Sequence, residues 1–244
     1  MSESNHPVAV VTGGSRGIGA DIVRRFIDAG YQVINLSLEQ AEFEHERLRT
    51  IITDLSDRGA VQDSAEQIVA SCAVTTFVHN AGVIRPDLLE NVQLEDLDYL
   101  TELHLGSAIR LSQRFLPAMK AAHYGRIVMI SSRGVLGLAT RTSYAATKAG
   151  QIGVVRTWAL ELAQHGITVN CVAPGPVETD MFSELVPENT PVKQRIIDSL
   201  PVRRLGTPAD VGRVVLFLCD RESGFITGQI WYVCGGASLG ALAL

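Results

Sequence analysis

The chain has 244 residues, of which 46% are hydrophobic and 19% charged, and it carries a formal net charge of −5 at pH 7. This size and composition fit a single α/β domain over residues 1–244, and the negative charge argues against nucleic acid or an anionic membrane surface as a partner. No apolar run is long enough for a membrane span and the first residues lack a signal-peptide pattern, so we expect a cytoplasmic protein.

Short β-rich runs alternate with longer segments of helical periodicity along the chain. The pattern predicts strands at residues 7–13, 31–36, 50–55, 75–80, 125–132, 167–173 and 228–233. It predicts helices at residues 19–30, 58–72, 94–122, 142–166 and 208–220. Strands and helices that alternate in this way form a parallel sheet with helices on both faces. Ligands of such sheets bind at the carboxyl ends of the strands, so functional motifs are expected just after strands.

The cysteines give no sign of a disulfide framework or a metal site. Cys72, Cys171, Cys219 and Cys234 have no C-x-x-C spacing. In a cytoplasmic chain we expect them to be reduced and to belong to the packing.

The first predicted strand leads into a glycine-rich loop, "VVTGGSRGIGA" at 10–20. Gly13, Gly14, Gly17 and Gly19 permit a tight turn and let the backbone approach a pyrophosphate, whose charge faces the N-terminus of the following helix. The spacing is G-x-x-x-G-x-G, and no Gly-Lys-Ser/Thr sequence ends it, which excludes a kinase-type phosphate loop. A glycine-rich turn that binds nothing is the alternative.

The helix predicted from residue 142 opens with "TSYAATKAG", in which Tyr144 and Lys148 are the large polar side chains. Residues four apart share one face of a helix, so both point into the same cleft. A phenol titrates near about pH 10. A fixed ammonium nearby is expected to lower that pKa and to make Tyr144 a usable general acid. The alternative is an amphipathic pair on a surface helix.

Six segments carry a resemblance to a known family. They are "TGGSRGIG" at 12–19, "HNAG" at 79–82, "SS" at 131–132, "YAATK" at 144–148, "APGPVET" at 173–179 and "ITGQIWYVCGG" at 226–236. On these segments the chain resembles the short-chain dehydrogenase/reductase family over essentially its whole length, in particular its 3-oxoacyl reductase-like members. The resemblance implies a Rossmann-like, doubly wound parallel sheet in a three-layer α/β/α arrangement, a nicotinamide cofactor, and hydride transfer between a carbonyl and a secondary alcohol. It also implies a substrate lid near residues 178–206 and a homotetramer.

The same resemblance assigns expected roles to residues of this chain. Ser132, Tyr144 and Lys148 are the expected catalytic residues, with Tyr144 as general acid/base and the serine hydroxyl binding the substrate oxygen. The residues expected to bind the cofactor are Gly13, Ser15, Arg16, Gly17, Ile18, Gly19, Ser37, Asp54, Leu55, Asn80, Ala81, Gly82, Tyr144, Lys148, Pro174, Gly175, Val177 and Thr179.

Three positions depart from the family pattern. The usual spacing to the tyrosine selects Ser131 as the catalytic serine, whereas the usual strand ending selects Ser132; we favour Ser132 because loops absorb deletions more easily than strands. His104 stands where many members have an asparagine whose main-chain carbonyl carries a water-linked proton path to the lysine. His104 either titrates in that relay or is a packed neutral histidine. Cys234 replaces a frequent aspartate, which bears on the packing of the C-terminal segment.

The end of the second predicted strand bears on the choice of cofactor. An acidic residue there would bind the ribose hydroxyls and exclude a 2′-phosphate, but the position is Ser37. We therefore expect NADP in preference to NAD, with Arg16 as a partner for the extra phosphate. Leu38 stands where many NADP-dependent members have arginine, and Glu39 is close by, so NAD stays possible.

Further features concern the substrate, the assembly and the choice of function. Arg133 and Arg141 bracket the loop before Tyr144 and are candidates for binding an acidic substrate, such as a carboxylate or an acyl carrier's phosphates; the alternative is that both are solvated. The apolar tail "ASLGALAL" at 237–244 suggests a subunit interface. Two functions stay open: an active oxidoreductase acting on a small carbonyl or alcohol, and a catalytically silent cofactor-binding or redox-sensing protein. Ser, Tyr and Lys together favour the enzyme.

Overall fold

The structure, a computed structural model, describes residues 6–239 and is built on a seven-stranded sheet. The strands are β1 (Val8–Thr12), β2 (Gln32–Ser37), β3 (Leu48–Ile52), β4 (Val74–His79), β5 (Gly125–Ile130), β6 (Ile167–Pro174) and β7 (Ile230–Val233). They lie in the order β3-β2-β1-β4-β5-β6-β7, and every neighbouring pair is parallel. β1, β5 and β6 are buried at every position, which is typical of a sheet covered on both faces.

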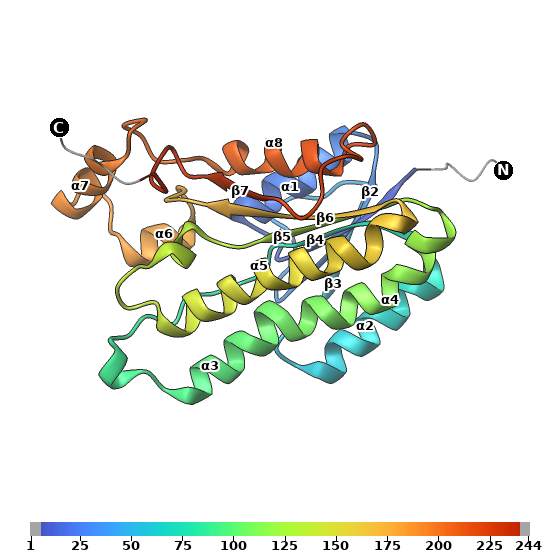
Figure 1. Cartoon of the computed structure of the whole chain (residues 1–244), viewed down its shortest axis with the longest axis horizontal. Helices are drawn as coiled ribbons and strands as arrows, with labels where there is room; N and C mark the ends of the chain where they lie inside the picture. The colour runs from blue at the N-terminus through green and yellow to red at the C-terminus, as the bar shows by residue number, and fades with distance from the viewer. Residues whose placement is uncertain (1–5, 240–244) are drawn as a thin grey trace.

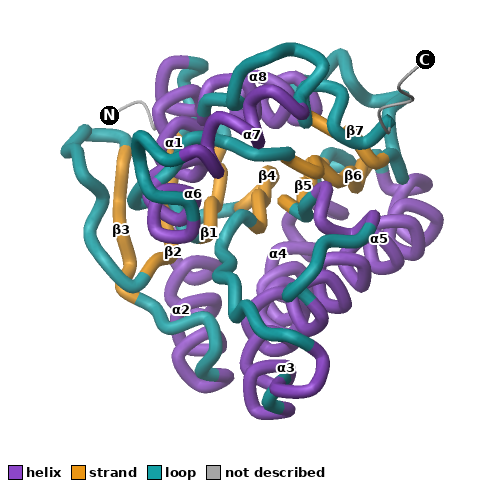
Figure 2. Tube along the Cα trace, turned by 90° about the vertical axis from the view of Figure 1, so that its left-hand side faces the viewer, coloured by secondary structure: helices purple, strands orange, loops and turns teal. Residues whose placement is uncertain are grey.

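Helices cover both faces of this sheet (Figures 1 and 2). The helices that flank it are α1 (Gly17–Asp28), α2 (Arg58–Ser71), α4 (Ser107–Ala121), α5 (Thr142–Leu162) and α8 (Pro208–Cys219). α1 and α8 pack together on one face around Phe26 and Val215, while α2, α4 and α5 cover the other face around Phe77 and Phe115. This is the Rossmann-like, doubly wound, three-layer α/β/α arrangement that the sequence predicts, and the fold class is confirmed.

The strand order places the functional segments at one edge of the sheet. β2 and β3 lie on one side of β1, and β4 to β7 lie on the other. Such a reversal of direction creates a crevice at the carboxyl ends of the strands, where ligands bind. The glycine loop follows β1, Asn80 follows β4, Ser131 and Ser132 follow β5, and Pro174 ends β6.

The predicted helix at 94–122 is divided into three parts. α3 (Leu94–Thr101) is followed by a π-helical turn, Glu102–Gly106, and then by α4. π-Helical turns insert an extra residue into a helix and occur frequently at functional sites. His104, which replaces the asparagine of many family members, lies in this turn.

The segment predicted as a substrate lid contains two short helices, α6 (Asp180–Leu185) and α7 (Pro191–Ser199). Thr190 caps α7 through its side chain and Pro191 follows at the first helical position, a favoured start for a helix. Figure 1 shows both helices standing beyond the end of the sheet, at the left. Residues 6–239 also contain three short 3₁₀ turns: Leu89–Asn91, Arg133–Leu136 and Ala163–His165.

Several smaller expectations can be compared with the structure. The four cysteines are free thiols, as predicted. None of the helices within residues 6–239 is both long and apolar enough to span a membrane. Of the apolar tail at 237–244, residues 240–244 lie outside the described residues.

Candidate active site

The loop between β1 and α1 adopts conformations that favour glycine. Gly13 and Gly17 have φ angles of +63° and +56°, a region that residues with a Cβ rarely adopt. A Cβ on Gly19 would overlap the carbonyl oxygen of Gly13, so the loop folds tightly onto the first turn of α1. The N-cap residue Arg16 makes no side-chain capping bond. The first N–H groups of α1 therefore face the carboxyl edge of the sheet, where an anionic group binds favourably.

A buried side chain of β2 fixes the shape of this loop. Asn35 accepts a hydrogen bond from the Gly14 N–H (2.7 Å) and donates to the Ser15 hydroxyl (3.0 Å). Ser15 in turn donates to the main-chain oxygen of Glu39 (2.6 Å). The glycine loop is thus tied to the strand that ends at Ser37.

The segment after β4 is held against the glycine loop by the hydroxyl of Thr12. This hydroxyl accepts from the N–H groups of Asn80 and Ala81, each at 3.0 Å, and lies 3.0 Å from Nδ1 of His79. The side chain of Asn80 donates to the carbonyl oxygens of Thr12 (3.2 Å) and Gly13 (2.9 Å). Two of the predicted cofactor-binding segments therefore form one hydrogen-bonded unit at the centre of the sheet.

The two serines at the end of β5 face different ways. Ser131 is buried and donates to the main-chain oxygen of Lys148 (2.8 Å), so it anchors α5. Ser132 accepts from the Gly134 N–H (3.0 Å), and a hydrogen bond between its hydroxyl and Tyr144 lowers the pKa of that phenol. A Cβ on Gly134 would lie 3.2 Å from Ser132 Oγ and 3.7 Å from Tyr144 Cε1. Ser132 and Tyr144 therefore share one surface, as the alternation of side chains along a strand predicts.

Lys148 is buried beside the tyrosine. Its ammonium donates to the main-chain oxygen of Ile130 (2.7 Å) and lies 5.9 Å from the centre of the Tyr144 ring. Burial lowers the pKa of Lys148 to about 8, against a smaller raising effect of Cys171. A lysine in this environment can exchange a proton near neutral pH, which an arginine cannot do.

The pKa of Tyr144 differs from the expectation. Burial raises it, and the hydrogen bond to Ser132 and the charge of Arg141 oppose that rise. Lys148 is not among the groups of the protein that lower the pKa of Tyr144. The prediction that this lysine lowers the pKa of the phenol is therefore wrong for the protein without a bound cofactor. The physical reason is that burial disfavours the charged form of both side chains.

His104 is buried in the π-helical turn. Its Nδ1 lies 2.9 Å from Oγ1 of Thr147, and its ring stands edge-on to Tyr144 with the ring centres 5.8 Å apart. Burial, the charge of Lys148 and the neighbouring ring of His79 lower the pKa of His104 far below its ordinary value. The imidazole is therefore neutral at physiological pH, which favours the packed neutral histidine over the titrating relay.

The strip after β6 closes the site on the side of the glycine loop. A Cβ on Gly175 would meet the backbone of Cys234 at 2.7 Å, so the strip runs close against the C-terminal segment. Val177 is buried and pairs with Gly206. A Cβ on Gly17 would lie 3.4 Å from Cγ2 of Thr179. The predicted positions at 174–179 thus reach the loop at 13–19.

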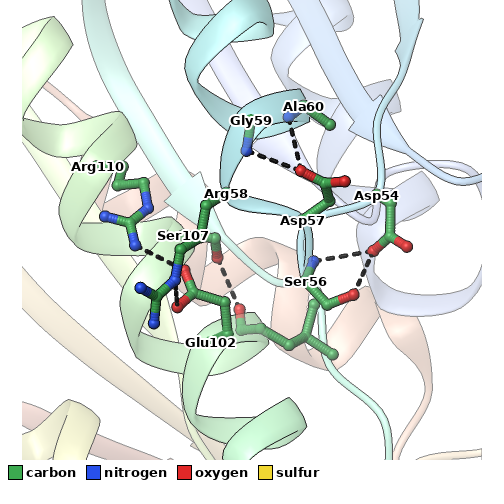
Figure 3. A network of polar contacts seen from close by, with 10 residues as sticks. Asp54, Ser56, Asp57, Arg58, Gly59, Ala60, Glu102, Ser107 and Arg110 are labelled. Carbon is green, nitrogen blue, oxygen red and sulfur yellow. Dashed lines mark hydrogen bonds and ion pairs between the residues drawn. The ribbon is translucent and has the colours of Figure 1, made fainter.

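The positions predicted at the adenosine end are more exposed. The carboxylate of Asp54 accepts from the N–H (2.9 Å) and the hydroxyl (2.7 Å) of Ser56, as Figure 3 shows, while Leu55 is buried. Arg16 is exposed and lies 4.0 Å from Asp180 of α6.

The two arginines near the tyrosine have different surroundings. Arg133 donates through Nε to the main-chain oxygen of Ala237 (3.2 Å) and so ties the C-terminal segment to the loop after β5. Arg141 precedes α5, donates to Thr140 (3.3 Å), and its charge lowers the pKa of Tyr144. Its buried Nε has no hydrogen-bond partner among the described residues. Of the two, Arg141 is the arginine whose charge acts on the phenol.

Comparison with known proteins identifies the family. A family model described as Enoyl-(Acyl carrier protein) reductase matches residues 13–238. The chain is 36% identical to the (2S)-[(R)-hydroxy(phenyl)methyl]succinyl-CoA dehydrogenase subunit BbsD of Thauera aromatica, over 95% of this chain and 96% of that protein. It is 35% identical to the 3-oxoacyl-[acyl-carrier-protein] reductase FabG of Thermotoga maritima, over 94% and 96%. The chain belongs to the short-chain dehydrogenase/reductase family.

Solved structures agree with this membership. The aldohexose dehydrogenase AldT of Thermoplasma acidophilum superposes with a TM-score of 0.90 at 28% identity, covering 98% of this chain and 96% of that one. A putative NAD(P) dependent gluconate 5-dehydrogenase of Beutenbergia cavernae, with bound NADP, superposes with a TM-score of 0.87 at 30% identity, covering 98% and 99%. The chain is an NAD(P)-dependent oxidoreductase that interconverts a carbonyl and a secondary alcohol, as the sequence predicts.

The residues of this short-chain dehydrogenase/reductase fit a dinucleotide. The uncapped start of α1 presents N–H groups to a pyrophosphate, and the glycines beside it leave the backbone accessible. Gly82 passes so close to His104 and Lys148 that a Cβ there would lie 2.8 Å from His104 Nε2 and 3.1 Å from Lys148 Nζ. The backbone can therefore run past these two side chains only because this position has no side chain of its own.

Sequence reasoning missed three polar residues that support the site. Asn35, which holds the glycine loop, interrupts an apolar strand, and a buried polar residue of this kind has a hydrogen-bonding role as a rule. Thr147 and Gln151 both contact His104. Their spacing from Tyr144 is i+3 and i+7, which places them on its helix face, so the sequence did contain the signal.

Proposed function

We propose that this chain is an NADP-preferring reductase of 3-oxoacyl thioesters, with Ser132, Tyr144 and Lys148 as its catalytic residues. The observation that carries the proposal is the shared surface of Ser132 and Tyr144, with the ammonium of Lys148 buried behind it. The thioester substrate is supported by the two relatives at 36% and 35% identity, a hydroxy(phenyl)methylsuccinyl-CoA dehydrogenase subunit and a 3-oxoacyl-[acyl-carrier-protein] reductase.

The residues suit the reductive direction. When bound, the cofactor supplies hydride to the carbonyl carbon. Ser132 binds the carbonyl oxygen and stabilises the charge that develops there, and Tyr144 donates its proton to that oxygen. Because burial raises the pKa of Tyr144, the phenol is protonated at neutral pH, which is the state that reduction requires. Lys148, whose pKa burial lowers to about 8, can return a proton to the site afterwards.

Each segment at the carboxyl edge has a proposed part in holding the cofactor. The loop residues Gly13, Ser15, Gly17, Ile18 and Gly19 would bind the pyrophosphate at the start of α1. Asp54 and Leu55 would contact the adenine, and Asn80, Ala81 and Gly82 would line the adenosine ribose. Lys148 and Tyr144 would contact the second ribose. Pro174, Gly175, Val177 and Thr179 would flank the nicotinamide, with the segment near 178–206 as the lid.

The preference for NADP rests on two residues. β2 ends at the uncharged Ser37, which offers no carboxylate to repel a 2′-phosphate. The side chain of Arg16 is 58% exposed, and its single ion-pair contact among residues 6–239, with Asp180, is long at 4.0 Å. Arg16 is therefore available to pair with the extra phosphate.

The surroundings of Arg141 favour an acidic group on the substrate. Its guanidinium acts electrostatically on Tyr144 and forms no ion pair among the described residues. A substrate carboxylate or phosphate near the reacting carbonyl would compensate that charge. The bond from Arg133 to Ala237 gives that residue a structural contact instead.

We also propose a cytoplasmic homotetramer, and exposed apolar side chains support the assembly. Phe217 of α8, Phe225 and Tyr232 of β7 are exposed, and so are Ile109 of α4 and Leu160 of α5, two helices that cover the opposite face of the sheet from α8. Exposed apolar side chains on two faces suit two separate subunit interfaces, which a closed tetramer requires. The net charge of −5 supports a small-molecule partner and not nucleic acid.

The test is the reduction of acetoacetyl-CoA with NADPH and with NADH, and the loss of absorbance of the reduced nicotinamide measures the rate. We expect a higher kcat/KM with NADPH. We expect Tyr144→Phe to lower kcat by about 100-fold or more, and Ser132→Ala to lower it by about 100-fold. Ser131→Ala is the matched control and should retain most of the activity, because its hydroxyl bonds to the backbone of α5. Undiminished turnover by Tyr144→Phe, or a larger loss in Ser131→Ala than in Ser132→Ala, would contradict the assignment.

A further inference from the structure

One face of α5 carries more polar groups than the proposed chemistry uses. Thr147 and Gln151 lie on the face of Tyr144 and Lys148, both are buried, and both contact His104. Thr147 Oγ1 lies 2.9 Å from His104 Nδ1, and Gln151 Nε2 donates to the main-chain oxygen of His104 at 3.0 Å. The π-helical turn is therefore docked onto α5 through both the ring and the carbonyl of one residue.

The contacts of Thr147 indicate which ring nitrogen of His104 carries the proton. The Thr147 hydroxyl lies 3.1 Å from the main-chain oxygens of both Ser143 and Tyr144. A hydroxyl has one proton and carbonyl oxygens have none to give, so the hydroxyl donates to this pair. It then accepts from Nδ1–H of His104. Because the ring is neutral, Nε2 is left with a lone pair.

That lone pair faces an ammonium with unused donors. His104 Nε2 is buried and has no hydrogen-bond partner among residues 6–239. It and Lys148 Nζ converge on Gly82, where a Cβ would lie 2.8 Å and 3.1 Å from the two nitrogens. An ammonium has three N–H groups, and Ile130 accepts one of them. The opposite tautomer would set an N–H against the ammonium, which is electrostatically unfavourable.

We infer that His104 is a positioning residue for Lys148: its Nε2 accepts a hydrogen bond from the ammonium through one bridging water and so keeps Lys148 charged and directed at the site. A Cβ on Gly82 would lie 2.8 Å from one nitrogen and 3.1 Å from the other, so the two nitrogens are at most about two hydrogen-bond lengths apart, a span that one water can bridge. In the family that this chain resembles, the main-chain oxygen at position 104 is linked through water to the lysine. Here Gln151 donates to that oxygen, and the ring of His104 takes over the link to Lys148.

The other titratable groups around Lys148 do not supply such an acceptor. His79 of β4 is buried and neutral. The Thr12 hydroxyl already accepts from two N–H groups, so it donates its own proton to His79 Nδ1. The other ring nitrogen of His79, Nε2, therefore carries the proton and is a donor. Burial raises the pKa of Cys171 of β6 to about 11, so its thiol stays protonated. Tyr144 is protonated as well.

The first test needs no variant and no turnover. Nitrogen-15 NMR of the cofactor-free protein distinguishes the two neutral tautomers of His104, and we expect the Nδ1–H form. The pKa of Lys148 can be followed with carbon-13-labelled lysine, since the chain has three lysines, Lys120, Lys148 and Lys193. The Nε2–H tautomer would overturn the inference.

Two amide variants test the roles of the two ring nitrogens separately. His104→Asn places an amide near Nδ1 and keeps the link to Thr147 but has no atom at Nε2, whereas His104→Gln places its amide near Nε2. We expect the pKa of Lys148 to fall by about one unit in His104→Asn, because an acceptor for the charged form is lost, and to stay close to wild type in His104→Gln. His123→Gln, at an exposed histidine, is the control and should change nothing.

A kinetic measurement extends the test and rests on the proposed function. The basic limb of the kcat profile should move to lower pH in His104→Asn and not in His104→Gln. An equal pKa of Lys148 in wild type and in both variants would refute the inference, whatever the activity. A protein that reduces no carbonyl but shows the Nδ1–H tautomer and the Asn–Gln difference would support the inference and refute the proposed function.

Discussion

Among single residues, Lys148 reduces the stability of the folded state, because its charged side chain is buried. Burial lowers its pKa from 10.5 to about 8. Below about pH 8 the lysine is charged in both the folded and unfolded states, and the folded state bears the full desolvation cost. Between that pH and 10.5 the folded state loses the proton while the unfolded chain keeps it, so the cost declines as the pH rises.

A Lys148→Met variant should therefore be more stable than wild type at neutral pH. We expect a gain in the free energy of unfolding on the order of 2 kcal/mol at pH 7, shrinking toward zero above about pH 10. Urea denaturation at both pH values measures it, and Lys120→Met, at an exposed lysine of α4, should show no such pH dependence. A constant difference between wild type and Lys148→Met at all pH values would show that burial does not tune this lysine.

The site residues show what can be predicted from the sequence at this scale. The spacing of Tyr144 and Lys148 predicted that the two side chains lie close together, because helix geometry alone determines which residues share a face, and the ammonium lies 5.9 Å from the ring. The direction of the pKa change at Tyr144 was predicted wrongly, since it depends on burial by segments distant in sequence. Which way Ser131 and Ser132 face followed from strand alternation, but the partner of Ser131, the main-chain oxygen of Lys148, did not.

At the scale of elements, the π-helical turn depends on one carboxylate. Glu102, at the start of the turn, lies 2.8 Å from Arg58 Nε of α2 and 3.1 Å from Arg110 Nη2 of α4 (Figure 3). Its side chain is 13% exposed, and the missing Cβ of Gly106 leaves room for the carboxylate, which a methyl group there would overlap. Ser107 adds a bond to the turn, from its hydroxyl to the main-chain oxygen of Leu103 (2.7 Å).

Removing that carboxylate should destabilise the fold more than removing an exposed one. We expect Glu102→Ala to lower the free energy of unfolding by about 1–3 kcal/mol, because two arginines lose a largely buried partner. Glu66→Ala is the control: Glu66 also joins α2 to α4, through Arg114 at 2.9 Å, but both side chains are about half exposed, so its loss should cost less than about 0.5 kcal/mol. Equal losses in the two variants would mean that Glu102 does not hold the turn.

The elements themselves were predicted well where local pattern decides them. Buried strands and amphipathic helices follow from periodicity, and all seven strands were found. The π-helical turn was not predicted, because the apolar period runs on through 94–122 and the interruption is stabilised by contacts of Glu102 with α2 and of His104 with α5. The lid helix α7 was also missed, although Thr190 and Pro191 are a helix-start signal readable in the sequence.

At the scale of the whole molecule, the outer surfaces carry apolar side chains that a monomer would leave in water. Phe225 is fully exposed and Phe217 about half exposed near β7, while Leu160 of α5 is 85% exposed on the other layer. The two layers lie on opposite faces of the sheet, as Figure 1 shows for α8 and α5. Two distinct self-complementary patches generate a closed tetramer, whereas one patch would stop at a dimer.

One charged substitution on each of the two apolar surfaces tests the assembly. We expect wild type to have the mass of a tetramer in sedimentation or light scattering, and Phe225→Asp and Leu160→Asp each to leave a dimer, because a carboxylate in an apolar interface has no partner and is costly to bury. The double variant should be a monomer. Ile52→Asp, at an exposed position of the edge strand β3 far from both patches, is the control and should stay tetrameric. A monomeric wild type would contradict the proposal, and dissociation of Ile52→Asp would move the interface to the other edge of the sheet.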